Sequence, residues 1–460
     1  MKRVMGLIML LALTAVAAAS AFQAAAREQQ YRVLLSRGDV AVRDGETFGA
    51  IEAFSGAIAL RPDSMLAHLR RGETYRQRGD LDAAARDFRK AAALDPSATR
   101  PLEALGDVLY RRQRFKGAAD VYQSRLSLDD RSEQVAYRLA LARYRDGDID
   151  ATLAALAHTL RLNDRLPDAY YLLGLCLRGK RRLPDAIKAF ETAVARSPGM
   201  IPAREELAEL YRSLGRHTDE LVQLQYIALL DRTNAERQVA VGLAQARAGH
   251  SEQAVLTLGN ALDRTPDQPP VYAALGRVWL EMAPGRSDAL SKALEALERV
   301  ASTGAGTSEV MTLYGRALLK ADQPEAAERV LQQAIKRYPV DPEAFLAYAE
   351  AAERQDHLAA ARTALIAYGT LMGIDGAFVT RATRIGELSL RLDEPAAAAV
   401  WFQRALDAAP TDLRLLASLA DAQIRAGDPE SARPMIARGL AKDPDNPLLL
   451  ALSRRLRPRN

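Results

Sequence analysis

The chain has 460 residues, of which 48% are hydrophobic and 26% are charged, and its formal net charge is +5. This composition provides ample apolar side chain for a buried core, while the small excess of Lys and Arg over Asp and Glu is too thin to indicate nucleic acid binding. The single cysteine, Cys176, excludes a disulfide within the chain and a cysteine-rich metal site.

The first 26 residues have the layout of a secretory signal peptide or of an N-terminal membrane anchor. Lys2 and Arg3 give a positive start, an apolar run follows from residue 5 to about 19, and small residues at 19–21 and 24–26 offer cleavage sites. The stretch 5–22 is near the lower limit of length for a membrane-spanning helix, so both interpretations stay open. We expect an exported protein, periplasmic or secreted after cleavage and otherwise anchored in the inner membrane by residues 5–22. The abundance of Ala and Arg suggests a bacterial gene.

From about residue 31 the sequence repeats itself with a period of about 34 residues, which is typical of stacked helical hairpins. Phe54 has Ala50 four residues before it and Pro62 eight residues after it, and the same pattern recurs around Phe88 and Phe190. Units begin near residues 31, 65, 99, 133, 167, 201, 235, 269, 308, 342, 379 and 413.

The eighth position of every unit holds a small residue. A glycine or alanine there lets two helices approach closely, and a bulky apolar residue about sixteen positions later fills the space between them. The proline beyond it ends the second helix, and a glycine commonly ends the first. The small residues are Gly38, Gly72, Gly106, Ala140, Gly174, Ala208, Gly242, Gly276, Gly315, Ala349, Gly386 and Ala420.

These residues resemble those of the tetratricopeptide repeat family, from about Tyr31 to Asn446. The resemblance implies an all-α fold, a right-handed α-solenoid of about twelve helical hairpins over residues 27–446. Each helix should have about 14 residues, and a helix at 447–460 with a basic tail should cap the last open face.

Some units depart from the pattern. Unit six has Glu220 where alanine is expected, and unit eight carries an insertion at 283–285 followed by the glycine-containing segment 302–307. Unit ten ends in 369–376 without a proline. We expect irregular stacking at the last two places, with a candidate subdomain break near 301–307.

A basic residue recurs near the end of the first helix of most units. In the family, side chains near this site line the concave groove, so the series could grip an acidic partner. A cation is also stabilising at a helix C-terminus, and acids at Asp39, Asp107, Glu350, Glu387 and Asp421 stand one turn before five of the series. The residues are Arg43, Arg76, Arg111, Arg145, Arg178, Arg212, Arg247, Lys320, Arg354, Arg391 and Arg425.

The candidate partner-binding residues are Tyr144, Arg145, Tyr171 and Arg178, in units four and five. Neither arginine has an acid one turn before it, and Tyr and Arg are residues enriched at protein interfaces. These four residues form our prediction of a contact site.

The sequence carries no sign of catalysis, a cofactor or a metal. Its five histidines are scattered, no phosphate-binding glycine loop occurs, and Cys176 lies in an apolar helix where it should pack as a small hydrophobe. We therefore expect no catalytic residues, no metal ligands and no enzyme activity.

Export, repeats and the missing active site together predict a non-catalytic scaffold of the bacterial cell envelope. The concave groove would bind partner proteins, most simply envelope components, or an extended ligand such as a polysaccharide, in secretion, outer-membrane or exopolysaccharide assembly. The alternative is a recruiting subunit of a separately encoded enzyme such as a glycosyltransferase. Nucleic acid is not an expected partner, and the membrane would be contacted only through an uncleaved N-terminal segment.

Overall fold

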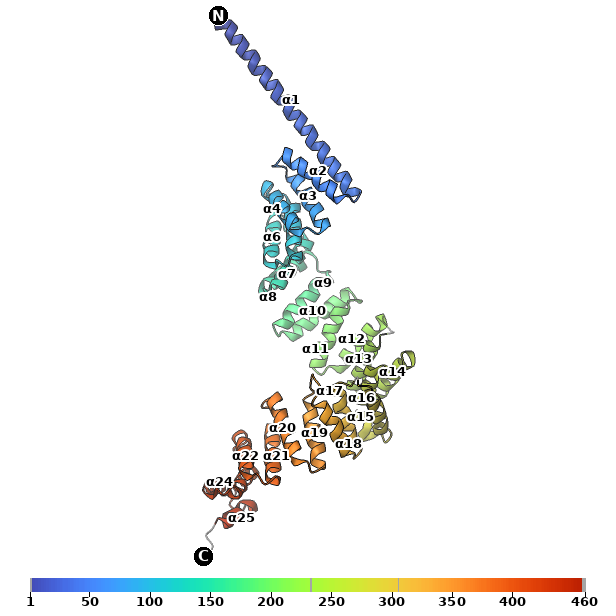
Figure 1. Ribbon diagram of the computed structural model, residues 1–460, viewed down its shortest axis with the longest axis vertical. Helices are drawn as coiled ribbons and strands as arrows, with labels where there is room; N and C mark the ends of the chain where they lie inside the picture. The colour runs from blue at the N-terminus through green and yellow to red at the C-terminus, as the bar shows by residue number, and fades with distance from the viewer. Residues whose placement is uncertain (1, 232–233, 305, 457–460) are drawn as a thin grey trace. The chain divides into compact units, whose positions relative to one another are not determined.

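The structure is a computed structural model that describes residues 2–231, 234–304 and 306–456, and in the first helix the side chains of residue 13 and of residues 18 onward. The chain divides into two compact units, Met1–Leu210 and Tyr211–Asn460, which are treated separately below. Within the described residues the chain forms 25 α-helices and one short 3-10 helix, and no strand (Figure 1). The predicted all-α repeat architecture is confirmed.

The first unit contains α1 to α10 and most of α11. From α1 to α10 each helix packs on the next helix in the chain, and some first helices of neighbouring repeats also touch, as α3 touches α5 and α7 touches α9. The helices are α1 Lys2–Arg43, α2 Thr47–Leu60, α3 Met65–Arg78, α4 Leu81–Leu94, α5 Thr99–Arg111, α6 Phe115–Leu128, α7 Glu133–Asp146, α8 Ile149–Leu162, α9 Pro167–Gly179, α10 Leu183–Arg196 and α11 Ile201–Ser213.

The second unit continues the same pattern of packed hairpins. The segment 301–307, where the sequence suggests a break, lies inside this unit. Its helices are α12 His217–Leu230, α13 Ala235–Arg247, α14 Ser251–Arg264, α15 Pro269–Met282, the 3-10 helix Ala283–Gly285, α16 Ala289–Ser302, α17 Ser308–Lys320, α18 Pro324–Ala334, α19 Glu343–Arg354, α20 Leu358–Met372, α21 Phe378–Arg391, α22 Pro395–Ala408, α23 Leu413–Arg425, α24 Pro429–Lys442 and α25 Pro447–Arg455.

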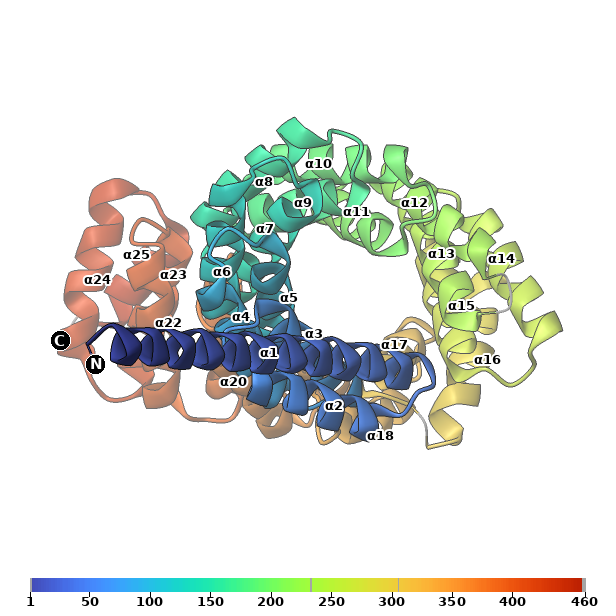
Figure 2. The same ribbon diagram turned by 90° about the horizontal axis from the view of Figure 1, so that it is seen from above.

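Helix α1 is a single uninterrupted helix of 42 residues, seen as one long ribbon in Figure 2. Its last turns form the first helix of repeat one, and the predicted cleavage sites at 19–26 lie within it, on exposed residues. The side chains of residues 1–12 and 14–17, on which the signal or anchor prediction depends, lie outside the described set. Among the residues that are described, no helix has an apolar stretch long enough to cross a membrane.

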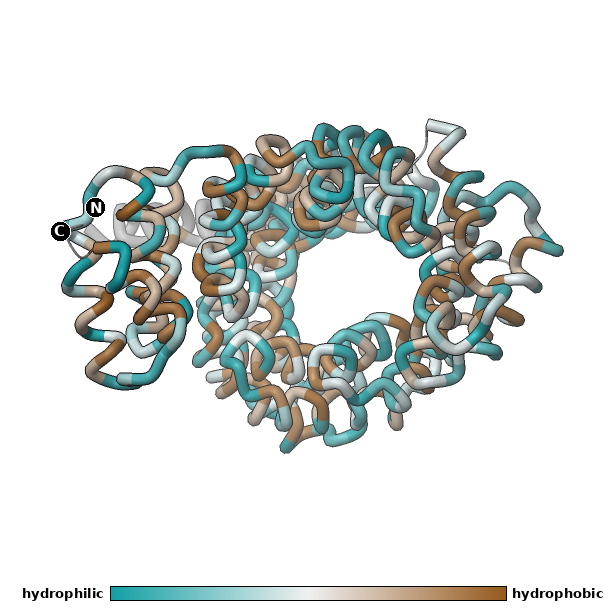
Figure 3. Tube along the Cα trace, turned by 90° about the horizontal axis from the view of Figure 1, so that it is seen from below, coloured by the Kyte–Doolittle hydropathy of each residue, from teal (hydrophilic) through white to brown (hydrophobic). Residues whose placement is uncertain are grey.

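The core of each hairpin is closed by the small residue at the eighth position. A Cβ added to Gly174 would lie 2.4 Å from the ring of Phe190, and one added to Gly38 would lie 2.4 Å from Phe54. Such distances leave no room for a side chain at Gly174 or Gly38, so these two crossings require glycine. Figure 3 shows the corresponding alternation of hydrophobic and hydrophilic residues along the helices.

The insertion in repeat eight changes this pairing. The sequence pattern places the bulky partner sixteen positions after Gly276, but the Cβ position of Gly276 faces Leu297 instead. The 3-10 helix Ala283–Gly285 takes up the added residues before α16 begins. Leu297 is fully buried, so the insertion shifts the partner along the chain and preserves the contact.

The residue that follows the first helix adopts a left-handed conformation in eleven repeats, with φ between 55° and 91°. Six of the eleven are the glycines that the sequence pattern predicts, and the others are three aspartates, Gln113 and Arg181. At Gly79 the turn is closed by hydrogen bonds from Gly79 N to Arg76 O and from Asp80 N to Tyr75 O. This arrangement satisfies carbonyl groups that the helix leaves without partners.

The last helix covers the end of the second unit. Leu449 and Leu452 of α25 are buried against Ala417, Ala420 and neighbouring residues, as a capping helix requires. Arg455, at the end of this helix, donates to Asp421 Oδ1 at 2.8 Å. The remaining tail residues 457–460 lie outside the described residues.

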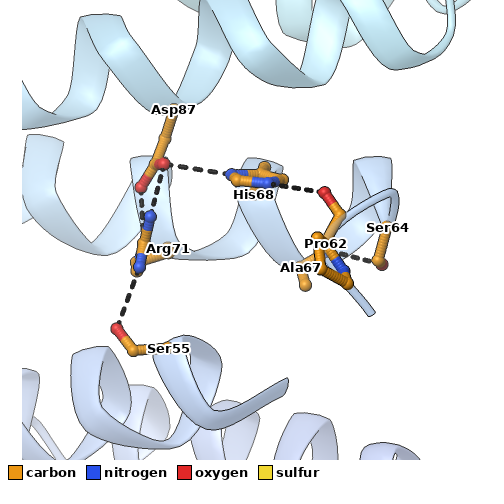
Figure 4. Close-up of polar contacts among 7 residues, drawn as sticks. All are labelled: Ser55, Pro62, Ser64, Ala67, His68, Arg71 and Asp87. Carbon is orange, nitrogen blue, oxygen red and sulfur yellow. Dashed lines mark hydrogen bonds and ion pairs between the residues drawn. The ribbon is translucent and has the colours of Figure 1, made fainter. Parts of the chain in front are cut away.

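A buried polar cluster joins repeats one and two in the first unit. Asp87 of α4 accepts hydrogen bonds from Arg71 Nε at 2.7 Å and Arg71 Nη2 at 2.8 Å, and lies 3.1 Å from His68 Nδ1 (Figure 4). Arg71 also donates to Ser55, and the other ring nitrogen of His68 lies 3.2 Å from the carbonyl oxygen of Pro62. The buried charges are thus fully partnered, which offsets the cost of removing them from water.

A second buried charge lies in the second unit. Glu220 is 0% exposed and occupies the position where most other repeats have alanine. It accepts hydrogen bonds from Arg212 Nε at 3.0 Å and from Arg247 Nη2 at 2.6 Å, and His217 Nδ1 lies 3.5 Å away. Burial by itself would raise the pKa of Glu220, but the hydrogen bonds and charges of the two arginines outweigh it and hold that pKa below its usual 4.5.

Candidate functional site

The first helices of repeats three to five carry a regular series of tyrosines. Tyr110 of α5 and Tyr144 of α7 occupy the same position of their repeats, and Tyr137 of α7 and Tyr171 of α9 share another. The two members of each pair therefore stand one repeat apart. All four side chains are half-buried. We call these four residues the tyrosine series.

Neighbouring members of the series come close enough to affect one another's ionisation. Burial raises the pKa of Tyr137 to about 12, and the nearby Asp168 and Tyr110 add to this shift. Burial also raises the pKa of Tyr171, with further contributions from Glu206 and Tyr144. The hydroxyls of Tyr137 and Tyr171 therefore stay protonated at neutral pH and can donate hydrogen bonds.

Three polar side chains, those of Asp107, Tyr122 and Arg138, lie beside Tyr110 and are called the polar floor here. Tyr122, which is buried, donates from its hydroxyl to Asp107 Oδ1 at 2.7 Å. Arg138 of the next repeat lies 3.2 Å from the same oxygen and donates to Glu103 Oε1 at 2.7 Å. These contacts fix Asp107 and Arg138 as neutralised parts of the surface.

A pocket of about 280 Å³ opens above this floor. Its lining includes Tyr110, Arg111 and Leu141 together with the floor residues. It is therefore bordered by an aromatic ring, an aliphatic side chain and a guanidinium, a mixture suited to holding a side chain of a bound protein.

The structure places the four predicted contact residues on these same helices. Tyr144 and Tyr171 lie near each other, and Arg145 is exposed and makes no ion pair with any described residue. Arg178 differs, because Glu206 of the next repeat forms an ion pair with it and Glu209 lies 3.7 Å away. Arg178 is thus already compensated within the first unit.

The predicted contact site did not include Tyr110, Arg111 or Tyr137, although Arg111 belongs to the predicted series of basic residues. Each stands one repeat before a predicted contact residue, namely Tyr144, Arg145 or Tyr171. The signal was therefore present in the repeat spacing itself. Arg111 is exposed and has no ion-pair partner in the described part of the chain, so it extends the series of available cations by one repeat.

Several members of the wider series of basic residues form ion pairs with acidic side chains. Of the five acid–base pairs predicted one helical turn apart, those of Glu350 with Arg354 and of Asp421 with Arg425 form, both at 2.7 Å. Asp39, Asp107 and Glu387 instead pair with an arginine other than the predicted one: Arg70, Arg138 and Arg384. Six of the eleven basic residues form ion pairs: Arg178, Arg212, Arg247, Arg354, Arg391 and Arg425. Of those without an ion pair among the described residues, Arg111 and Arg145 are the ones beside the tyrosine series.

The residues with catalytic potential are placed as packing residues. Cys176 is fully buried, and burial raises its pKa to about 11, which disfavours the reactive thiolate. In the part of the chain that the structure describes, no three His, Cys, Asp or Glu side chains gather so that they could hold a metal ion.

A stack of helical hairpins with a side-chain-lined face defines a repeat scaffold, a class of protein whose extended surfaces bind other macromolecules. Family models described as tetratricopeptide repeat match residues 69–130, 137–201, 232–367 and 390–456. The chain belongs to the tetratricopeptide repeat family. No curated protein sequence matches it.

Solved structures with the same kind of fold match at low identity. A crystal structure of MamA protein is 23% identical with a TM-score of 0.36, over 37% of this chain and 93% of that chain. A solved structure of Pseudomonas aeruginosa pilF is 18% identical with a TM-score of 0.37, over 46% of this chain and 97% of that chain. A tetratricopeptide repeat protein from Parabacteroides merdae is 16% identical with a TM-score of 0.39, over 54% and 99%. Likenesses of this degree say nothing about function.

Proposed function

We propose that the protein is a non-catalytic scaffold that binds an extended segment of a partner protein along the first helices of repeats three to five. The observation that supports this proposal is the tyrosine series, which recurs from one repeat to the next beside the exposed Arg111 and Arg145. A surface that repeats its side chains once per hairpin suits a ligand that is itself extended.

The chemistry of the face indicates what such a segment contains. Half-buried tyrosines offer apolar ring area together with a hydroxyl that can donate to a backbone carbonyl. Arg111 and Arg145 offer planar guanidinium groups that match carboxylates in a two-point contact. A suitable partner segment has aliphatic or small residues to contact the tyrosine rings. It also has two acidic side chains, spaced so that one reaches Arg111 and the other reaches Arg145, which stand one repeat apart on this chain. An uncharged glycan would leave both arginines without partners.

We further propose that the scaffold acts in the bacterial cell envelope, where secretion, outer-membrane or exopolysaccharide assembly would supply its partners. The supporting feature is the N-terminal sequence, with Lys2 and Arg3 before the apolar run and small residues at 19–21 and 24–26. Cell fractionation combined with mass spectrometry of the mature N-terminus tests this point. An intact N-terminus in the cytosolic fraction would contradict export.

The binding proposal is tested by crosslinking in cells that express the wild type or the double variant Arg111→Glu/Arg145→Glu. We expect the variant to lose specific crosslinked proteins because two repulsive charges replace two attractive ones on the contact face. The matched control is Arg89→Glu, an exposed arginine on α4 without an ion pair among the described residues. An unchanged partner profile for the double variant, or loss of the same partners in the control, would refute the assignment. Recovery of glycan in place of protein would also refute it.

A further inference from the structure

The junction between repeats ten and eleven is irregular. Repeat ten begins near residue 342 and repeat eleven near 379, three positions later than the regular period would place it. Helix α20 is 15 residues long, and Gly373 at its end has a φ of 71°. No proline follows this helix at the usual place, and the connection before α21 begins at Phe378 has five residues, against four in most of the other repeats.

This irregularity leaves an apolar pocket of about 270 Å³ in the second unit. Leu365 and Ile366 of α20, Phe378 and Ile385 of α21, and Trp401 of α22 contribute to its lining. The volume is below the roughly 300–1,000 Å³ usual for small-molecule sites, so its size suits one large side chain of a bound protein better than a cofactor.

Large apolar side chains stand exposed on the segment that borders the pocket. Leu371, Met372 and Ile374 are 57%, 50% and 83% exposed. Three such residues within four positions, next to an apolar pocket, form a patch of the kind that marks protein interaction sites.

The charge of the lining favours an acidic neighbour for the bound side chain. The charged residues that line the pocket are Arg381 and Arg404, and no acid joins them in the described lining. Arg381 is buried and compensated, because it donates to Asp375 Oδ2 at 3.1 Å and to the Gly373 carbonyl at 3.3 Å. Arg404 is exposed, lies 4.6 Å from the ring centroid of Trp401, and has no carboxylate partner in the described part of the chain.

We propose that this pocket is a second binding site, which takes one leucine or phenylalanine side chain of a partner protein with an adjacent Asp or Glu paired to Arg404. The apolar side chain fills the space bordered by Ile366, Phe378 and Trp401, and the carboxylate meets the one lining cation that has no acid of its own among the described residues. The site lies on different helices from the tyrosine series and stands independently of it.

The probes are two synthetic octapeptides that carry charges of opposite sign beside the same Leu-Phe pair, Gly-Ser-Asp-Leu-Phe-Asp-Ser-Gly and Gly-Ser-Lys-Leu-Phe-Lys-Ser-Gly. Calorimetric titration into the full chain measures both affinities, and the emission of Trp401, one of two tryptophans in the chain, reports occupancy of the pocket. We expect the aspartate peptide to bind at least roughly 10-fold more tightly than the lysine peptide. The absence of any preference would overturn the proposal.

Two variants locate the binding. Gly369→Leu places a side chain in the pocket without strain, since the nearest atom to an added Cβ is Arg381 Nε at 3.6 Å, and it should abolish binding of the aspartate peptide. Arg404→Glu should reverse the preference in favour of the lysine peptide, while Arg414→Glu, an exposed arginine on α23, should leave it unchanged.

Binding of the aspartate peptide by Gly369→Leu at the wild-type affinity would overturn the proposal, as would a preference that Arg404→Glu does not alter. The variant Arg145→Glu should bind both peptides as the wild type does. A failure of the tyrosine series to bind a partner is therefore distinguishable from a failure of this pocket.

Discussion

Repeat five and repeat ten use a helical glycine for opposite purposes. In repeat five, Gly174 closes the hairpin, because the ring of Phe190 would lie 2.4 Å from any Cβ at that position. In repeat ten, Gly369 lines an open pocket, and an added Cβ would have only Arg381 Nε near it, at an ordinary contact distance of 3.6 Å. The same residue type thus removes space between two helices in one repeat and leaves space open to a ligand in the other.

The difference follows from repeat length. A unit of the regular length brings each small residue opposite its bulky partner, so the interior closes and function is left to the exposed face. The added length of repeat ten displaces the connection between α20 and α21, so the interior is incompletely covered. The regular repeats three to five thus carry a periodic face, whereas the irregular connection of repeat ten borders an apolar pocket.

The largest effect should come from Gly174→Leu. Four side-chain carbons would have to enter space that Phe190 fills, and overpacking of this kind costs about 1–3 kcal/mol in unfolding free energy. Because long repeat arrays do not always unfold in one step, the measurement is hydrogen–deuterium exchange of α9 and α10, supported by thermal melting. Faster exchange in both helices is the expected result.

Two further glycine-to-leucine variants provide the control. Gly179 lies at the end of the same helix α9, and an added Cβ there would meet nothing within 4 Å. Gly179→Leu and Gly369→Leu should leave exchange near their positions unchanged or slowed, since leucine is a better helix former than glycine. Equal destabilisation by all three variants would mean that leucine is disfavoured in these helices for a reason other than the contact with Phe190.

A smaller loss is expected from Glu220→Gln. Repeat five has Ala186 at the position of Glu220, so repeat six has exchanged a small apolar residue for a buried carboxylate held by two arginines. Removing the charge weakens both hydrogen bonds and should cost about 1.5 kcal/mol, the lower end for bonds to charged groups, because both arginines are partly exposed. Urea unfolding at neutral pH, followed by exchange in α12 and α13, measures this loss.

The difference in stability between the wild type and Glu220→Gln should depend on pH in a defined direction. The pKa of Glu220 is lower in the folded chain than its usual 4.5, so its stabilising contribution is fully present above that value and is lost as pH falls through the lower, folded pKa. The stability difference between wild type and Glu220→Gln should therefore shrink on acidification from pH 6 to about pH 3. A difference that stays constant, or grows, over this range would contradict the assignment.

The periodic part of the molecule was predictable and the irregular part was not. The closing glycines and the turn glycines follow from spacing alone. The ion-pair partners of long charged side chains could not be predicted in this way. Glu206 pairs with Arg178, and Arg138 pairs with Asp107, each across two repeats, and no fixed spacing in the sequence relates such partners. The pocket beside Trp401 was not predicted either. The missing proline at 369–376 indicates an irregular repeat, but the sequence does not show that a pocket forms there.

The smallest effect is a gain in stability from Arg181→Gly. Arg181 follows α9 with φ at 59°, in the turn position that six repeats fill with glycine. A side chain in this left-handed region costs roughly 1–2 kcal/mol, and glycine recovers that strain but loses about 0.5–1 kcal/mol of unfolded-state entropy. The net expectation is about 0.5–1 kcal/mol of added stability, measured as slower exchange at the end of α9.

The reciprocal change completes the comparison. Gly147 holds the same turn position one repeat earlier with φ at 87°, so Gly147→Arg imposes on repeat four the strain that repeat five already bears. It should destabilise the end of α7 by a similar amount, and the pair Gly147→Arg/Arg181→Gly should come out near the wild type, since turns one repeat apart act nearly independently. Stabilisation by Arg181→Gly without destabilisation by Gly147→Arg would show that Arg181 is unfavourable for reasons other than its backbone, such as repulsion from its neighbours Lys180 and Arg182.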